Sequence, residues 1–547
     1  MLDLKNNLFS MAIPQNSLDR RKQHQIFTQR QLYWFNFLLI ILIIFGIFFR
    51  IINIENKVYW HDEVYTSIRA GGHLAEAIYK NAFNNRFVSI KELQKFQDFK
   101  PESTILDTIK SLIQEDPQHP PFYFILSRYT LYLFGNSLTY NRILAIFFSL
   151  LSIPLIYLFS FNLFQSKLIA SLSAIILSLS PFDIIFAQIN RQYSLLTLLT
   201  ILSSWMLWRT LNKPTLLNWI FYTVACTLGL YTQPFFCLTI FSHFCFILID
   251  SLILSKNKSY LIQFGLSIFV TMILYSPWIY VLITRFQKVL MLTNWVYFKQ
   301  GFLFFVQLWL LNFTCLFTDF FVGINNPITY LYRLFFMAII FLAFYTLYRQ
   351  VNRKIFIFLL TLSFAPFLIL LIPDLYSGSF RTVVTRYLIP CYPGIQIAVA
   401  YYLSKILNPS KIGKLILIFF LTNGIVFGTL ITFAETSWAK VPSYYNAETA
   451  KKINAVSSPL VISDQGETWT NLGEIISLSY LVNKDTQFFL TSDPPNLEKL
   501  ENGLKANSSP ILVFQPSQKL KSSLENLNYR LENIYAPGNL YRLAKKS

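Results

Sequence analysis

Long apolar runs separated by short polar loops dominate the chain up to residue 433. The run at 33–54 is long enough to cross a bilayer, whose hydrocarbon core is about 30 Å thick. The run at 121–135 reaches only about 22 Å as a helix and contains Arg128, so we expect an interfacial helix there. A second interfacial or re-entrant element is expected at 301–321. The other predicted spans are 140–160, 167–187, 195–208, 214–232, 235–254, 260–281, 329–348, 355–372, 388–405 and 413–433.

The basic residues indicate how these spans are oriented. They cluster in short loops, for example at 209–213, 256–258 and 349–354, and loops rich in Lys and Arg stay in the cytoplasm. An arrangement of about eleven spans places every such loop on the cytoplasmic side. Letting both doubtful segments cross gives about thirteen spans and puts the loops between them on the wrong side. Both arrangements leave the C-terminal part outside.

Three parts of the chain differ in character. Residues 1–32 are polar and basic and are predicted to form a cytoplasmic, partly disordered tail. Residues 33–433 form the predicted membrane domain, in which 55–139 is a large extracytoplasmic loop with interfacial helices. Residues 434–547 are predicted to form a small extracytoplasmic α/β domain, because short apolar strands alternate there with polar, partly helical stretches. Its predicted strands are 460–464, 486–490, 511–515 and 539–543.

Composition supports a polytopic, mainly α-helical membrane protein. Of the 547 residues, 54% are hydrophobic and 13% are charged, about half the charged fraction of a soluble domain. The net charge of +19 is spread over short loops and forms no basic stripe, which argues against a nucleic-acid partner. The five cysteines form no CxxC pair, so they indicate neither a metal site nor a disulfide scaffold.

Polar groups that interrupt the apolar sequence gather on the predicted non-cytoplasmic side. An ion-coupled transporter usually places ionisable groups near the middle of the bilayer, whereas these lie at its surface. The pattern therefore favours surface chemistry on a lipid-linked molecule over transport. The groups concerned are His61, Asp62, Glu63, Gln118, His119, Arg191, Arg381 and Arg386.

One base and several cations suit sugar transfer from a lipid phosphate. The phosphate leaves as a stable anion, so the site needs a base for the acceptor hydroxyl and positive charge for the phosphate. Asp62 or Glu63 could be the base, and side chains of neighbouring residues point in different directions, so we do not expect a close pair. Arg191, Arg381 and Arg386 are candidates for the phosphate, because guanidinium groups bind phosphate through paired hydrogen bonds. For each arginine, anchoring to lipid headgroups is the alternative.

His61 and His119 could join the acids in a divalent metal site. Three well-separated ligands do not follow from the spacing, so we assign no metal ligand and favour a structural or phosphate-contacting role for His119. The C-terminal part contains no glycine-rich phosphate loop.

An ordered set of short motifs resembles the GT-C glycosyltransferases of the dolichyl-phosphate-mannose protein mannosyltransferase and aminoarabinose transferase type, often called family 39-like. Each motif is short, but their order and spacing cover about the first 400 residues. They are Trp-His-Asp-Glu at 60–63, His-Pro-Pro-Phe-Tyr at 119–123, the stretch 134–142 that starts with Phe-Gly-Asn-Ser, 187–196, and Arg-Tyr-Leu-Ile-Pro at 386–390.

The resemblance implies a GT-C fold, a polyprenyl-phosphate sugar donor and inversion at the anomeric carbon. It makes Asp62 the best candidate for the base, with Glu63 beside it, and places Arg386 and Tyr387 near the lipid phosphate. Some relatives carry a second acid in the loop matching 190–194, which this chain lacks, so substrate identity does not transfer directly. Residues expected to line the substrate site are His61, Tyr65 and Tyr193.

The sequence therefore favours an integral-membrane, inverting glycosyltransferase. It would move a sugar from a polyprenyl phosphate to a lipid, glycan or protein acceptor on the non-cytoplasmic face. The plasma membrane is the expected location. The rival hypothesis is a non-catalytic membrane protein that binds or flips polyprenyl-linked glycans.

Overall fold

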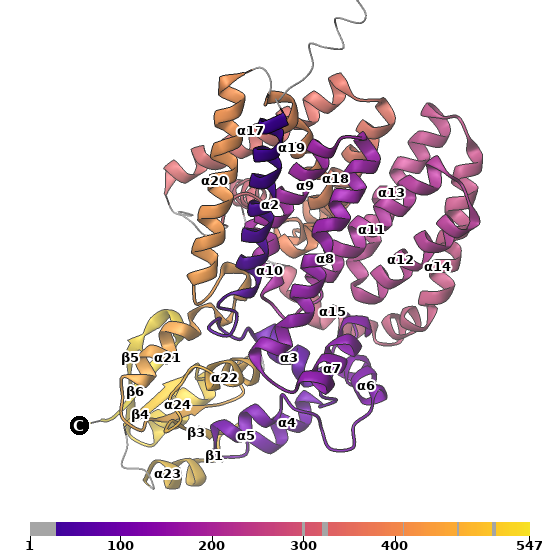
Figure 1. Cartoon of the computed structure of the whole chain (residues 1–547). Coiled ribbons are helices and arrows are strands. Elements are labelled where there is room, and N and C mark those ends of the chain that lie inside the picture. The colour runs from indigo at the N-terminus through magenta and orange to yellow at the C-terminus, as the bar shows by residue number, and fades with distance from the viewer. Residues whose placement is uncertain are drawn as a thin grey trace, which may run out of the picture.

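The computed structural model describes residues 29–297, 301–319, 326–407, 410–467, 470–505 and 510–546, with side chains from residue 37 onward. A bundle of long helices forms one part of the molecule, and short helices and a β-sheet gather at one end of it (Figure 1). The predicted cytoplasmic tail, 1–32, lies almost wholly outside the described residues.

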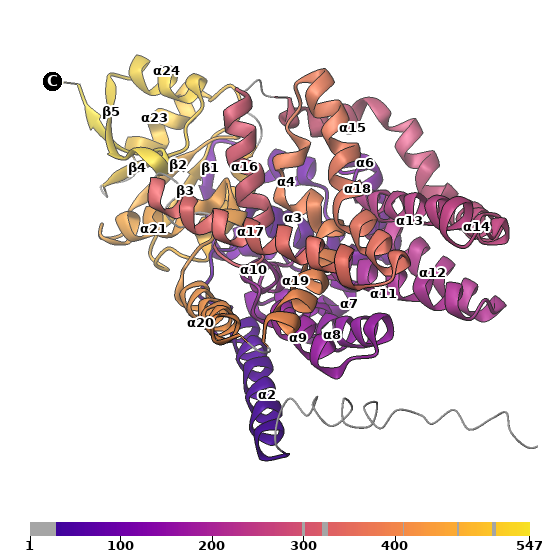
Figure 2. The ribbon, with the colours of Figure 1, turned by 90° about the horizontal axis from the view of Figure 1, so that it is seen from above.

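Long apolar helices that follow the predicted runs build the bundle (Figure 2). Seven described helices are long and apolar enough to cross a membrane, or eight if one bent pair is a single span. Three shorter apolar helices are also present: Phe37–Ile51 and Leu216–Thr232 lie at predicted spans, and Phe302–Thr314 lies at the segment that was predicted not to cross. The helices of the bundle are α2 (Gln29–Ile51), α8 (Leu138–Phe164), α9 (Lys167–Leu179), α10 (Pro181–Ala187), α11 (Tyr193–Asn212), α12 (Leu216–Thr232), α13 (Cys237–Ile249), α14 (Lys258–Thr284), α17 (Pro327–Gln350), α18 (Arg353–Ser377), α19 (Tyr392–Ile406) and α20 (Lys411–Phe433).

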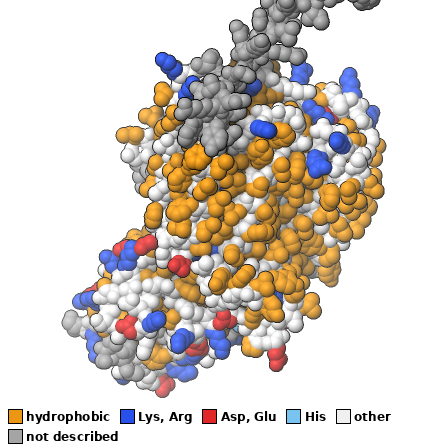
Figure 3. All heavy atoms as spheres, in the orientation of Figure 1, with side chains coloured by type: hydrophobic (Ala, Val, Ile, Leu, Met, Phe, Trp, Pro, Cys, Tyr) orange, Lys and Arg blue, Asp and Glu red, His pale blue; other side chains and the backbone are white. Residues whose placement is uncertain are grey.

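The surface of the bundle is apolar over a broad band. Figure 3 shows hydrophobic side chains across the bundle on one face, Lys and Arg at the end away from the sheet, and mixed acidic and basic residues on the smaller lobe. Exposed apolar side chains such as Ile273, Phe341 and Ile418 belong to this band. The predicted fold class, a polytopic helical membrane protein with a small strand-containing C-terminal region, is confirmed.

The predicted span at 167–187 is two helices, α9 and α10, bent by 57°. The break falls at Ser180 and Pro181, where proline lacks the N–H that a continuous helix needs. Arg50 of α2 donates hydrogen bonds to the carbonyls of Leu177 and Ser178 at the end of α9, which satisfies groups that the break leaves open. The bend directs the loop after α10, residues 188–192, toward the end of the bundle where the short helices lie.

Short helices cover this end of the bundle (Figure 1). Helix α7 has 13 residues, fewer than the about 20 that a span requires, and its Arg128 is buried. The Arg128 guanidinium donates to the carbonyls of Ala70 and Ser103, and so ties α7 to the end of α3 and to the segment before α6. The short helices are α3 (His61–Ala70), α4 (Ala75–Ala82), α5 (Ile90–Lys95), α6 (Ile105–Glu115), α7 (Phe122–Phe134), α15 (Phe286–Thr293) and α16 (Phe302–Thr314).

A six-stranded mixed sheet has the order β1-β3-β2-β4-β6-β5, with β3, β2 and β4 parallel. Apolar side chains of the sheet pack against α21 (Asn446–Asn454), α22 (Asn471–Ser479), α3 and α4 on one face. On the other face they pack against α23 (Leu497–Lys505) and α24 (Gln518–Asn526). The strands are β1 (Arg86–Val88), β2 (Leu460–Ser463), β3 (Gln487–Leu490), β4 (Ile511–Phe514), β5 (Tyr529–Tyr535) and β6 (Leu540–Lys545).

The four predicted strands correspond to β2, β3, β4 and β6. Strand β1 was not predicted: it comes from the first loop and pairs antiparallel with β3, where Val88 lies opposite Phe488. The sheet therefore joins chain from both sides of the predicted boundary at residue 434.

Candidate functional site

Helix α3 starts at His61, immediately after an extended Trp60, and carries two acids in its first turn. The Glu63 carboxylate turns back and accepts the N–H of Trp60 at 3.0 Å, as in a capping box. Asp62 points elsewhere, and 27% of its side chain is exposed, whereas Glu63 has no exposed surface. The two acids therefore occupy different environments, as their adjacent positions predict.

Two cations and two backbone N–H groups surround the Glu63 carboxylate. Arg142 donates from Nε and Nη2 to the two oxygens at 2.8 and 2.9 Å, and the Lys440 ammonium lies 3.3 Å from Oε2. The backbone N–H of Asn190 donates to Oε1 at 2.8 Å. Burial alone would raise the pKa of Glu63, but Arg142, Lys440 and these hydrogen bonds lower it to about 2. Glu63 is thus a buried carboxylate that joins α3, α8 and two distant loops.

The Asp62 carboxylate faces Arg191. The nearest oxygen of Asp62 lies 3.8 Å from Nη2 of Arg191, and no described residue donates a hydrogen bond to this carboxylate. Arg191 follows the bent α9–α10 pair and is held by the Thr66 hydroxyl at 3.1 Å and by Nε2 of His119 at 3.1 Å. The site therefore presents one accessible carboxylate beside a fixed guanidinium.

His119 supports Arg191 as a neutral acceptor. Burial lowers the pKa of His119 well below its usual value, and the charge of Arg191 lowers it further. Its Nε2 accepts from Arg191, so the proton of the neutral ring resides on Nδ1.

Arg386 reaches the same site from the turn before α19. Its guanidinium lies over the rings of Trp60, Trp295 and Tyr387, at 5.9, 5.4 and 5.9 Å from their centres. Burial would lower the pKa of Arg386, but the neighbouring Tyr193 and Asp62 raise it, so it stays charged. No hydrogen bond joins its side chain to any part of the chain that the structure describes. Arg386 is therefore a charged donor without an acceptor.

Tyr387 stacks on Phe235, with ring centres 4.0 Å apart. Arg381 is arranged differently from Arg386, because its guanidinium donates to the hydroxyls of Ser379 and Tyr297, the latter at 2.8 Å. These two partners place Arg381 in the segment after α18 and occupy part of its donor capacity.

The three residues predicted to line the substrate lie around α3. Nδ1 of His61 lies 3.2 Å from the buried Glu474 of α22. The ring of Tyr65 packs against His61 with centres 4.9 Å apart. Tyr193 starts α11 and packs edge-to-face on Phe186, with 3% of its surface exposed. Their role in lining a substrate stays a prediction.

Sequence reasoning gave no role to Arg142, Lys440 or Arg69. Arg142 belongs to one of the quoted motifs, and a charge inside an otherwise apolar helix was the available signal. Lys440 carried no local signal, because its partner Glu63 is 377 positions away. Arg69, also buried, pairs with Glu115 and Asp116 at the end of α6 and so fixes the other end of α3.

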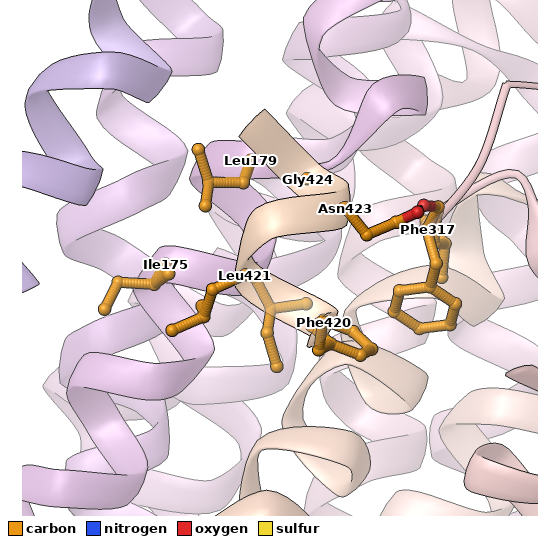
Figure 4. Close-up of a pocket in the computed structure, with 9 residues that line it drawn as sticks. Ile175, Leu179, Phe317, Phe420, Leu421, Asn423 and Gly424 are labelled. Atoms are coloured by element: carbon orange, nitrogen blue, oxygen red, sulfur yellow. The ribbon is translucent and has the colours of Figure 1, made fainter. Parts of the chain in front are cut away.

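Two other features were candidates for a binding site: a group of metal-ligating side chains and a crevice in the bundle. Among the described residues, no group of three or more His, Cys, Asp or Glu side chains could hold a metal ion. A small crevice between α9 and α20 is lined by apolar residues such as Ile175, Leu179 and Phe420, with Asn423 the polar exception (Figure 4). Its lining contains none of the site residues described above.

Comparison with known proteins matches one segment of the chain to a family model and most of the chain to a known fold. Residues 118–281 match the family model described as dolichyl-phosphate-mannose-protein mannosyltransferase. The chain is similar to ArnT from Cupriavidus metallidurans bound to undecaprenyl phosphate, with a TM-score of 0.52 and 12% identity over 93% of this chain and 97% of that one. It is also similar to the archaeal oligosaccharyltransferase AglB from Archaeoglobus fulgidus, in complex with an inhibitory peptide and a dolichol-phosphate. That TM-score is 0.50 with 13% identity, over 95% of this chain and 75% of that one. No curated protein matches the sequence.

Proposed function

Because the chain has the GT-C fold and carries a segment of the protein mannosyltransferase family, we propose that it is an integral-membrane, inverting glycosyltransferase. Its donor is a sugar on a polyprenyl phosphate, and its acceptor binds on the non-cytoplasmic face of the plasma membrane. The observation that carries the proposal is an accessible carboxylate, Asp62, that lies 3.8 Å from the guanidinium of Arg191 and near enough to Arg386 for its charge to act on that group.

Asp62 is the general base of the proposed reaction. Its carboxylate is exposed and free of hydrogen bonds from the described residues, so it can accept the proton of an acceptor hydroxyl. The acceptor oxygen forms a bond to the anomeric carbon while the bond from that carbon to the phosphate oxygen breaks. A single displacement of this kind inverts the anomeric carbon. Glu63 cannot share this role, because its oxygens are occupied and have no exposed surface.

The leaving group is a polyprenyl phosphate that gains negative charge. Arg386 is suited to receive it, since its donors have no acceptor among the described residues and a guanidinium binds phosphate through two parallel hydrogen bonds. Arg191 adds positive charge beside Asp62, and His119 keeps it in place. Support for the lipid comes from the two similar structures, one bound to undecaprenyl phosphate and the other to dolichol-phosphate.

The proposed orientation follows from the arrangement of charge. The end of the bundle away from the sheet carries Lys and Arg, as loops facing the cytoplasm do (Figure 3). Asp62 and its partners lie at the opposite end, which therefore faces outward, and the predicted division at residues 33–433 and 434–547 is kept as part of this proposal.

The test compares wild type with Asp62→Asn, which keeps the shape of the side chain and removes the base. Each protein is incubated with a panel of polyprenyl-phosphate sugars and a membrane extract as acceptor source, and release of free lipid phosphate is followed. We expect Asp62→Asn to lower the rate by about a hundredfold or more, the usual contribution of a general base. Binding of polyprenyl phosphate should persist, because Arg386 is unchanged.

The matched control is Glu55→Gln, which removes an exposed carboxylate seven residues earlier in the chain and should leave the rate unchanged. Equal rates for wild type and Asp62→Asn would remove Asp62 from the chemistry. Saturable lipid binding without release by wild type would favour the non-catalytic binder.

A further inference from the structure

The residues on both sides of Asp62 are held by chain from beyond residue 434. Lys440 approaches the Glu63 carboxylate at 3.3 Å and also donates to the carbonyl of Val58. His61, on the other side, lies 3.2 Å from Glu474. Asp62 is the residue between two side chains that are anchored to the C-terminal part.

Two further hydrogen bonds fix the start of α3. The indole N–H of Trp60 donates to the carbonyl of Val441 at 2.9 Å, and the backbone N–H of His61 donates to the Ser443 hydroxyl at 2.9 Å. An N–H in the first turn of a helix has no partner within the helix, so Ser443 supplies the cap that residue 60, a tryptophan, cannot. The segment 440–443 therefore contacts the N-terminus of α3 at several successive positions.

The contact continues into the sheet. Val64 and Ile68 of α3 belong to the same buried cluster as Leu472 and Ile475 of α22. Glu474 is itself fixed, because it accepts from the Ser443 hydroxyl at 2.8 Å and from the Asn446 amide at 3.0 Å. Helix α3 is thus packed between the bundle and the sheet.

The buried position of Lys440 argues against a role that only attaches the C-terminal part to α3. Only 2% of its surface is exposed, and burial, with the charge of Arg142, lowers its pKa to about 7 although Glu63 raises it. Burying an ammonium is costly unless it is paired, and a tether could use exposed pairs such as Lys451 with Glu435. The chain instead places a buried cation against the carboxylate next to Asp62.

We propose that the segment 440–443 and Glu474 are a positioning part of the catalytic site, in which Lys440 and Glu474 fix the residues on either side of Asp62 and thereby the direction of its carboxylate. This inference rests on the proposed function of Asp62 as the base. It gives the C-terminal part a role in the chemical step itself, beyond any contact with the acceptor. Lys440 and Glu474 touch no reacting atom and are positioning residues.

The experiment uses the full chain with Lys440→Met, Lys440→Arg and the control Lys451→Met, which removes the same charge from an exposed site of the same region. Lys440→Met leaves Glu63 paired with Arg142, so the protein should fold. Two quantities are measured: kcat and KM for the polyprenyl-phosphate donor, and hydrogen exchange of the α3 amides. The second reports the order of α3 whether or not the donor is turned over.

We expect Lys440→Met to lower kcat about tenfold, equivalent to about 1.4 kcal/mol, with an unchanged KM for the donor because Arg386 is untouched. Exchange of the α3 amides should rise about tenfold. Lys440→Arg should recover most of both, and Lys451→Met should match wild type. Glu474→Gln, which keeps a hydrogen-bonding side chain but removes the charge beside His61, should show a smaller change in the same direction.

Unchanged α3 exchange in Lys440→Met would overturn the inference, whatever the turnover. So would a normal kcat for each folded molecule combined with a lower unfolding temperature, since that is the behaviour of a purely structural residue. A wild type that releases no lipid phosphate would instead contradict the proposed function, and the exchange measurement keeps the two failures apart.

Discussion

Replacing Arg142 with methionine tests the account of the buried charges most directly. The Arg142 side chain has no exposed surface and donates to both oxygens of Glu63 and to the carbonyls of Ile54 and Val58. Removing one partner of a buried ion pair costs about 3–5 kcal/mol. Since Glu63 keeps Lys440 and two backbone N–H groups, we take the lower value, about 3 kcal/mol, for the pair. Val58 keeps the hydrogen bond from Lys440, but the carbonyls of Ile54 and Lys57 lose their donor and add about 1 kcal/mol each, so the expected loss is about 5 kcal/mol.

The measurement is the free energy of unfolding in mixed detergent micelles, titrated with a denaturing detergent. Arg86→Met is the matched control, because Arg86 pairs with Glu92 at the surface, where such pairs contribute about 0–1 kcal/mol. Arg142→Met should therefore lose several times more stability than Arg86→Met. Equal losses would refute the central role of Arg142 in the buried cluster.

A double variant distinguishes lost charge pairing from lost packing. In Glu63→Gln with Arg142→Met both members of the ion pair are neutral, and replacing a whole buried pair is often close to neutral in energy. Lys440 then lacks its carboxylate, but burial is the largest cause that lowers its pKa and remains in the double variant, so it can lose its proton at little cost. The double variant should recover more than half of the loss of Arg142→Met. Losses that simply add would show that packing around the methionine is responsible.

Two further predictions concern the donor and the pH range of stability. Arg386→Gln should weaken binding of polyprenyl phosphate by about tenfold or more, because a charged hydrogen bond contributes about 1.5–3 kcal/mol. Arg381→Gln should change the affinity for polyprenyl phosphate less than Arg386→Gln, since the Arg381 guanidinium is already hydrogen-bonded within the chain. Lipid-binding titrations of both variants test this order. The Glu63 pKa, lowered from 4.5 to about 2, stabilises the folded chain by about 3 kcal/mol above pH 4.5, and this is lost as the pH falls toward 2. Unfolding measured at pH 6 and pH 3 should therefore change less in Glu63→Gln than in wild type, and equal changes would contradict the assignment.

Local patterns predicted the helices and the separation of the two acids. An apolar run of about 20 residues has few alternatives to a membrane helix, so the long runs are helical, although the run at 167–187 is broken into two helices. Asp62 and Glu63 diverge because consecutive residues on a helix point in different directions, and only one of them faces the buried side of α3. The bend between α9 and α10 also had a readable signal, Pro181, which the sequence interpretation passed over.

Contacts between distant parts of the chain could not be predicted in this way. Strand β1 has three residues, too few to show an alternating pattern, and its existence depends on β3, about 400 positions later. The contact of Lys440 could not be predicted either, since nothing around it in the sequence indicates a carboxylate 377 positions earlier. These contacts are also the ones that tie the C-terminal part to α3.

The distribution of charge explains how two adjacent carboxylates acquire separate roles. Glu63 meets two buried cations and two backbone N–H groups, so its negative charge is compensated internally and serves to hold α3. Asp62 is left with a single guanidinium at 3.8 Å and an exposed surface, which leaves its oxygens available to an acceptor hydroxyl. Environments that separate two acids in this way assign them different tasks in many enzymes. If Asp62 is the base, the cluster around Glu63 holds in place the first turn of α3, which carries it.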